Sequence, residues 1–340
     1  MLDFVFKIVY NIKRYYNFSE HIMNQDNKTS IFQKPLIITL CALLCCALWG
    51  SASPAIKIGY ELLEVSGVPS TILFAGIRFT MAGVITVAIY SIARKRLLYP
   101  KLENMPKVLT VSAFQTVIQY IFFYIGLANT TSVKGTIASG SSAFFCVLIA
   151  SLIFRQEKLT VKKIVACILG FAGIIIVNLQ GLELTMKFIG DGFVIFSTIS
   201  YAFSSVLMKR FSKYEDPVVI SGYQFIIGGA LMVIVGLIMG GTISLSDFGG
   251  VMLLIYLAFL SAIAYALWGV LLKYNSVSKV SIFSFTTPIF GTILSLILLP
   301  GTSGVEPLNL VITLFLVSAG IFLLNYQPKN GLGKIPKNKE

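Results

Sequence analysis

The chain has 340 residues, of which 56% are hydrophobic and only 12% are charged, and its formal net charge is +13. Soluble proteins carry ~25% charged residues, so a soluble globule is excluded, and the abundance of large apolar residues excludes a disordered chain. A lipid bilayer is the surrounding that suits this composition. The positive charge is weak support for nucleic-acid binding, because membrane proteins retain Lys and Arg in their cytoplasmic loops. We therefore expect a lipid bilayer and no nucleic acid as partner.

Residues 1–34 are polar and basic and are predicted to form a cytoplasmic tail. The longest apolar run near the start, Phe4-Val5-Phe6, is too short for the hydrophobic region of a signal peptide. Three interpretations stay open: an interfacial amphipathic helix over residues 4–16, a disordered tail, or a translation start at Met23.

Ten apolar stretches follow, joined by short loops. Nine of them lack Asp, Glu, Lys and Arg, and the tenth, 65–93, is interrupted only by Arg78. Their apolar character is continuous, which favours helices over the alternating strands of a membrane barrel. The sequence predicts an all-α polytopic membrane protein with ten transmembrane helices within 35–56, 65–93, 108–133, 135–154, 164–182, 192–208, 217–246, 248–272, 280–305 and 307–328, and a basic cytoplasmic tail over 327–340.

The basic residues alternate between the two sides of this topology. If the N-terminus is inside, 23 of the 27 Lys and Arg residues lie inside. The outside holds only Lys57, Lys134 and Lys187, and Arg78 lies within a span. Because such asymmetry sets orientation, we expect a multi-pass protein of the cytoplasmic membrane with both termini in the cytoplasm.

Two halves of the chain resemble each other. Residues 120–145 match 265–290 at a constant offset, so that Tyr120 pairs with Tyr265, and residues 49–57 match 201–209. Each match is weak, but together they predict two five-helix repeats, 35–182 and 190–326. Five is an odd number, so the second repeat must cross the membrane in the opposite sense. Such inverted repeats are common in secondary transporters.

Several motifs resemble the EamA-like proteins of the drug/metabolite transporter (DMT) superfamily. Their order and spacing over 35–326 carry the resemblance, and they are Leu48-Trp49-Gly50-Ser51 with Pro54 and Lys57, Gly76-Ile77-Arg78-Phe79, Arg155-Gln156-Glu157 with Gly170 and Gly173, and Gly190-Asp191-Gly192 with Tyr201. The second half departs from the family where Pro300-Gly301 replaces the usual acidic residue. The resemblance implies ten helices in inverted repeats, a central cavity built mainly from helices 1, 3, 4, 6, 8 and 9, and transport of small metabolites, including amino acids.

Polar and aromatic side chains gather on these helices and are the candidates for lining a cavity. A mostly neutral cavity edged by aromatic rings would suit a small amphipathic molecule. The alternative is that small and hydroxyl residues serve helix packing. The candidates are Trp49, Ser53, Gln115, Gln119, Tyr120, Ser142, Tyr201, Ser204, Tyr265, Trp268 and Thr287.

Two cations stand apart as candidate binding or gating charges. An ionisable residue inside a span is costly, which makes Arg78 a functional candidate. Its alternative role is structural, paired with helix-end carbonyls or with an acid near the outer surface. Lys57 lies at the outer end of the first helix. Its alternative role is structural, with its ammonium extended to the membrane–water interface.

Other function classes lack the residues they need. The one histidine, His21, lies in the tail, no acid lies mid-membrane and no P-loop motif occurs, so we expect no enzyme, no metal and no cofactor. The missing mid-membrane carboxylate also disfavours a proton relay. The five cysteines all lie in apolar spans, where packing is their expected role. The prediction is a secondary transporter that moves small organic metabolites by alternating access, as an exporter; the alternatives are a multidrug efflux carrier and, less favoured, a channel.

Overall fold

The computed structural model describes residues 30–179, 185–298 and 306–326, and these are helical with no strand among them. The chain enters through a short 3-10 helix, η1 (Ile31–Gln33), before the first long helix. The two termini, and with them the predicted interfacial helix and the basic C-terminal tail, lie outside the described residues.

Ten helical segments follow in chain order. In the first repeat these are α2 (Pro35–Leu62), α3 (Gly67–Arg94), the run η2 (Leu102–Asn104), α4 (Met105–Ser112), η3 (Ala113–Ile118) and α5 (Gln119–Ala128), the run α6 (Ser132–Gly140), α7 (Ser142–Leu148) and η4 (Ile149–Ile153), and α8 (Val161–Val177). In the second repeat these are η5 (Phe188–Gly192) with α9 (Phe193–Phe211), α10 (Pro217–Ile238), α11 (Phe248–Tyr274), the run α12 (Val277–Ser281), η6 (Ile282–Thr286) and α13 (Thr287–Leu298), and α14 (Pro307–Asn325).

The ten-helix architecture is confirmed. Within the described residues, nine helices have at least 18 residues and are apolar enough to cross a membrane. The tenth, α8, has 17 residues, and its apolar sequence packs lengthwise on α14.

Some helices begin or end at other residues than predicted, because local hydrogen bonds set their ends. The predicted break at Lys134 was wrong: α5 ends at Ala128 and α6 begins at Ser132, because the Thr131 side chain accepts a hydrogen bond from the Lys134 amide and caps the new helix. The seventh helix ends at Ile238 rather than near 246. There, Gly240 adopts φ +81°, and the amide of Gly241 bonds to the carbonyl of Gly236, a glycine-based helix end.

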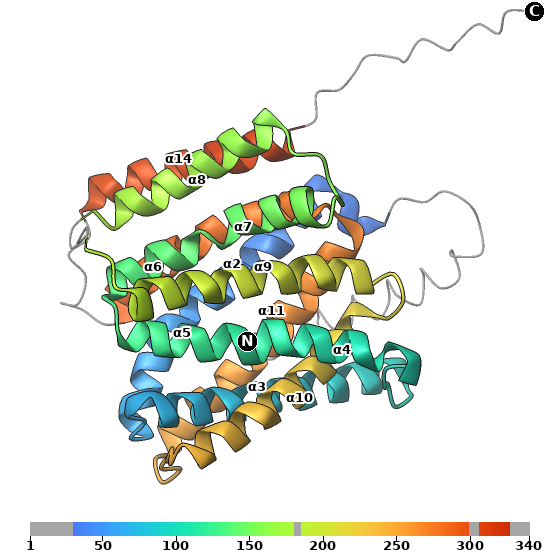
Figure 1. Cartoon of the computed structure of the whole chain (residues 1–340), viewed down its shortest axis with the longest axis vertical. Helices are drawn as coiled ribbons and strands as arrows, with labels where there is room; N and C mark the ends of the chain where they lie inside the picture. Colours follow the sequence, from blue (N-terminus) through green and yellow to red (C-terminus); the bar gives the residue numbers. More distant parts are fainter. Residues whose placement is uncertain (1–29, 180–184, 299–305, 327–340) are drawn as a thin grey trace, which may run out of the picture.

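Helix pairs from the two repeats form the flanks of the bundle. The α8–α14 pair lies along the top in Figure 1 and the α3–α10 pair along the bottom, with the remaining helices between them. The main contacts are repeated between counterpart helices. The first helix of the first repeat, α2, packs on the third and fourth helices of the second repeat, α11 and α13. In the same way α9, the first helix of the second repeat, packs on α5 and α7 of the first repeat. This internal symmetry is that of two five-helix repeats, and the odd number makes their senses opposite.

Glycines let α3 and α10 approach backbone to backbone. A Cβ placed on Gly229 would lie 2.5 Å from the amide nitrogen of Thr80 and 2.9 Å from the carbonyl oxygen of Gly76. A Cβ on Gly83 would lie 2.6 Å from the carbonyl oxygen of Gly222. Small residues of this kind allow the close helix packing that takes the place of hydrophobic burial in a bilayer.

Substituting Gly229 by valine is therefore expected to destabilise the fold. Neither backbone can yield locally, so the α3–α10 pair must separate, at a cost of about 1–3 kcal/mol or more. The expected result is a lower thermal unfolding midpoint and a smaller monodisperse fraction after purification. Leu231→Val, on the exposed side of α10, is the matched control. An unchanged midpoint for Gly229→Val would refute this helix contact.

Candidate functional site

Two tyrosines related by the repeat meet at the centre of the bundle. The hydroxyl oxygens of Tyr120 on α5 and Tyr265 on α11 lie 2.7 Å apart and share a hydrogen bond, and the residues are 145 positions apart. The sequence repeat had paired these two residues by position alone. Their contact places the pseudo-symmetry axis between α5 and α11.

Aromatic rings surround this tyrosine pair. Trp49 of α2 makes edge contacts with Tyr265 and Trp268, with ring centroids 5.1 and 4.9 Å apart. On the other side, the ring centroids of Phe79 and Tyr120 are 4.4 Å apart, and those of Phe225 and Tyr265 are 4.8 Å apart. Trp49 packs against each of the three apolar clusters of the bundle. We call Trp49, Phe79, Tyr120, Phe225, Tyr265 and Trp268 the aromatic centre.

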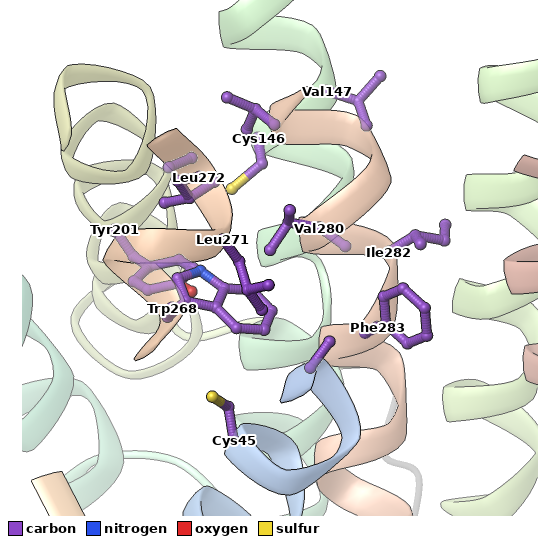
Figure 2. Packing of buried hydrophobic residues seen from close by; sticks show 14 of the residues in the cluster. Cys45, Cys146, Val147, Tyr201, Trp268, Leu271, Leu272, Val280, Ile282 and Phe283 are labelled. Carbon is purple, nitrogen blue, oxygen red and sulfur yellow. The ribbon is translucent and has the colours of Figure 1, made fainter. Parts of the chain in front are cut away.

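Tyr201 joins this region from α9. Figure 2 draws Tyr201 and Trp268 in one buried cluster that includes Cys45. Tyr201 matches Trp49 in the repeat. The two repeats thus each contribute an aromatic side chain from their first helix.

Two helices are interrupted beside the centre at equivalent positions. The α6–α7 helix breaks at Ser141, and η6 interrupts the other helix over Ile282–Thr286. The side chains of Ser141 and Thr286, which are repeat equivalents, each donate a hydrogen bond to the carbonyl three residues earlier. Broken helices at the repeat interface are typical of substrate sites in transporters. Ser142 and Thr287 begin the helices that follow the two breaks.

A π-helix holds one of two predicted cavity glutamines and precedes the other. Gln115 lies inside η3, and Gln119 follows at the start of α5. The backbone hydrogen bonds of this π-helix close at i+5 rather than i+4. The carbonyl of Phe114 in η3 accepts a hydrogen bond from Ser200 of α9. The π-helix thereby links the two repeats.

Buried polar atoms without hydrogen-bond partners are concentrated among the predicted cavity residues. Buried polar groups are normally paired, so unpaired ones indicate a place where a polar ligand or water is to be bound. Within the described residues, unpaired buried atoms occur on six predicted cavity residues, namely Trp49, Gln115, Gln119, Tyr201, Trp268 and Thr287, on the predicted charge Arg78, and on Ser151, Gln156, Gln224 and Ser281, which the sequence had not indicated.

The remaining predicted cavity residues are divided. Ser204 is fully buried and donates to the carbonyl of Tyr201, which is a structural role within α9. Ser53 and Lys57 are exposed and lie one turn apart on the side of α2 that carries Trp49. The exposed leucines Leu36 and Leu40 mark a different side, which suits contact with lipid.

Arg78 has neither of the partners expected for a structural role. Its side chain is 4% exposed, and its Nε and Nη1 atoms have no hydrogen-bond partner in the described part of the chain. Its guanidinium lies over the ring of Phe79, 4.6 Å from the centroid. None of the ion pairs between described residues involves Arg78.

One end of the bundle is closed by contacts between the repeats. We call it the basic end, because α3 ends there at Arg94 and α9 carries Lys209 and Arg210 in its last turn. Glu157, in the loop before α8, accepts hydrogen bonds from the amide and hydroxyl of Ser278 at the start of α12. It also pairs with the Lys163 ammonium at 2.8 Å. Burial alone would raise the pKa of Glu157, but the hydrogen bonds from Lys163 and Ser278 outweigh burial and lower it.

Lys209 completes this closure, and the sequence had not indicated it. Its ammonium donates to the carbonyls of Leu272 and Asn275, which terminate α11. Helix α9 packs here on α11 and α12. The repeat in the sequence could have indicated Lys209 as a candidate, because Lys209 occupies the position in the second half that Lys57 occupies in the first half.

At the opposite end, the described residues show fewer contacts between the repeats; the loop equivalent to that of Glu157, within 299–305, lies outside them. In the described residues, α2 makes no contact with α5 or α6 comparable to that of α9 with α11 and α12. Ser53 and Lys57 are exposed there. Their repeat equivalents are not: Ser205 is only 3% exposed, and Lys209 is bonded to α11. The two repeats have related sequences but different surroundings.

A hollow of about 730 Å³ lies at this opposite end. It is lined by residues 128–131, Lys134 and residues 187–190, and Lys134 there forms an ion pair with Asp191 at 3.8 Å. None of the predicted cavity residues lines it, so it is separate from the aromatic centre. The described residues contain no group of His, Cys, Asp and Glu side chains suited to a metal ion.

Comparisons with known proteins agree with this architecture. The chain is 25% identical over 297 residues to the WAT1-related protein At3g02690, chloroplastic, of Arabidopsis thaliana, covering 83% of this chain and 68% of that one. It is 26% identical over 289 residues to an uncharacterized transporter of Archaeoglobus fulgidus, covering 81% and 94%. A protein of known crystal structure shares the fold, with a TM-score of 0.70 and 17% identity over 84% of this chain and 96% of that one.

The repeats are also visible in the family comparison. The EamA-like transporter family matches this chain twice, over residues 36–179 and over residues 188–326. Together the two matches cover most of the chain, and each covers five of the ten helices. The chain belongs to the EamA-like transporter family.

Proposed function

We propose that this protein is a secondary transporter that carries a small organic metabolite across the cytoplasmic membrane by alternating access, working as an exporter. The basic end is then the cytoplasmic side, in keeping with the placement of Lys and Arg in cytoplasmic loops. The aromatic centre, between the two broken helices, is the substrate site. Its unpaired polar atoms supply hydrogen bonds to a substrate that is partly polar and partly apolar.

One observation carries this proposal. In the described part of the chain, Ser53 and Lys57 on α2 are exposed, whereas their repeat equivalents on α9 are not: Ser205 is buried and Lys209 is bonded to α11. An inverted repeat whose halves hold two different conformations has a second state in which the halves exchange them. In that state Lys57 would bind the end of α5, and Lys209 would be released.

Transport is tested with purified full-length protein in liposomes. The assay measures uptake of labelled amino acids, organic acids, nucleobases and cationic drugs, with and without unlabelled compound trapped inside. A carrier gives saturable uptake that is accelerated by trapped substrate. Uptake that rises linearly without such acceleration would indicate a channel, and preference for cationic drugs would indicate multidrug efflux. Failure of every compound would contradict the proposal.

Alternating access is tested by a matched pair of cysteine variants, Ser53→Cys and Ser205→Cys. Four native cysteines are buried and Cys41 is half-buried, so a Cys41→Ala background keeps unspecific labelling low. We expect a membrane-impermeant thiol reagent to label Ser53→Cys fast from outside, and Ser205→Cys slowly from the cytoplasmic side. Saturating substrate should shift the two rates in opposite directions. Equal rates that substrate leaves unchanged would contradict alternating access.

A further inference from the structure

We propose that Arg78 binds the carboxylate of a small monoanionic substrate whose apolar part lies against the aromatic centre. This inference rests on the proposed transport function and deepens it by naming the substrate class. It starts from a charge that the described part of the chain leaves without a counter-ion.

A buried, unpaired guanidinium is costly to maintain. At 4% exposure, with two of its nitrogens unpaired, Arg78 has lost most of its hydration without gaining the carboxylate that usually replaces it. The contact with the Phe79 ring at 4.6 Å contributes only about 0.5–2 kcal/mol. An intramembrane ion of this kind is a candidate functional site.

The position of Arg78 suits a ligand with two different ends. The guanidinium lies over the ring of Phe79, which itself belongs to the aromatic centre. The Phe79 ring in turn contacts Tyr120, with ring centroids 4.4 Å apart. A ligand held by Arg78 therefore reaches the aromatic centre with a short apolar group. This geometry fits a carboxylic acid with an aryl or branched alkyl substituent.

The single buried guanidinium of Arg78 determines the charge expected of the substrate. A guanidinium presents a planar fork that binds a carboxylate through two parallel hydrogen bonds. One buried cation neutralises one negative charge, so a phosphate dianion would leave excess charge in a poorly solvated site. Cationic compounds are repelled by the same guanidinium.

The protein carries its own reporter for this site. The chain has two tryptophans, Trp49 and Trp268, and both belong to the aromatic centre. Intrinsic fluorescence of the purified full-length protein in nanodiscs is titrated with three matched pairs: phenylacetate and phenylacetamide, isovalerate and isovaleramide, and hexanoate and hexanamide. Phenyl phosphate is added as the dianionic comparison.

We expect at least one acid to bind about tenfold or more tightly than its amide, as charge-assisted hydrogen bonds require. In Arg78→Gln this preference should fall to about onefold, while Arg78→Lys should retain part of it because only the fork is lost. Arg96→Gln, which removes an exposed guanidinium, should keep the full preference. A structural role for Arg78 would alter folding but not the ratio between acid and amide.

The proposal is overturned if the wild-type protein binds no acid better than its amide, if it prefers phenyl phosphate, or if Arg78→Gln keeps the preference. Should Arg78→Gln fail to fold, the wild-type comparison of acid and amide still decides. The proposed transport function is judged separately in liposomes. Binding that depends on Arg78 in the absence of flux would support the Arg78 site and contradict transport. Saturable flux of amides and acids at equal rates would support transport and contradict the Arg78 site.

Discussion

Replacement of Trp49 by alanine is expected to abolish saturable transport. The indole ring contacts Tyr265 and Trp268 and packs against all three apolar clusters. Its removal opens a cavity at the point where the two repeats meet. Truncating a buried aromatic side chain costs about 3–5 kcal/mol, and displacement of neighbouring site groups by 1 Å lowers rates by about a hundredfold. Flux into liposomes, at matched amounts of folded protein, measures this effect.

Two further variants separate packing from binding at Trp49. Trp49→Phe keeps an aromatic ring but removes the unpaired Nε1–H, so folding should be retained while substrate affinity falls. Phe315→Ala, on the exposed side of α14, should leave both flux and thermal stability near wild type. If folded Trp49→Ala transported with wild-type KM and turnover, the aromatic centre would not be the substrate site.

Substitution Glu157→Gln is expected to weaken closure of the basic end. The carboxylate joins the loop before α8 to Ser278 at the start of α12 and neutralises Lys163. The amide leaves the Lys163 ammonium uncompensated in a site where its side chain is 14% exposed. The expected loss is about 1–3 kcal/mol, read as faster labelling of Ser205→Cys and a lower thermal midpoint. Glu103→Gln, which removes an exposed ion pair with Lys101, is the matched control and should change neither value.

The same contact has a defined pH dependence. Because the pKa of Glu157 is lower in the folded protein than its ordinary value, its stabilising contribution is complete above the ordinary pKa of a glutamate, about 4.3, and is lost as the pH falls through the folded-state pKa. The difference in thermal midpoint between wild type and Glu157→Gln should be constant from pH 8 to about pH 5, and should vanish at lower pH. A difference that disappeared already between pH 8 and pH 6 would assign the effect to another group.

Hydropathy and charge are properties of local sequence, and for that reason the helices could be predicted from sequence alone. Each span needs only its own ~20 residues to reveal it. The exceptions arose where hydrogen bonds of single residues set the helix ends, as at Thr131 and Gly240. The π-helix over Ala113–Ile118 was not predicted either, because the apolar pattern of the sequence does not distinguish it from an α-helix.

The ten helices could be predicted from the amino-acid sequence, and so could the repeat offset that pairs Tyr120 with Tyr265 and Trp49 with Tyr201. Which polar side chains meet depends on the packing of distant segments, because contacts such as Tyr120–Tyr265 join residues 145 positions apart. The tertiary structure alone separated Ser204, which is used within its own helix, from Arg78, whose nitrogens remain unpaired. It also gave the equivalent residues Ser53 and Ser205 different exposure, because different described helices pack around them.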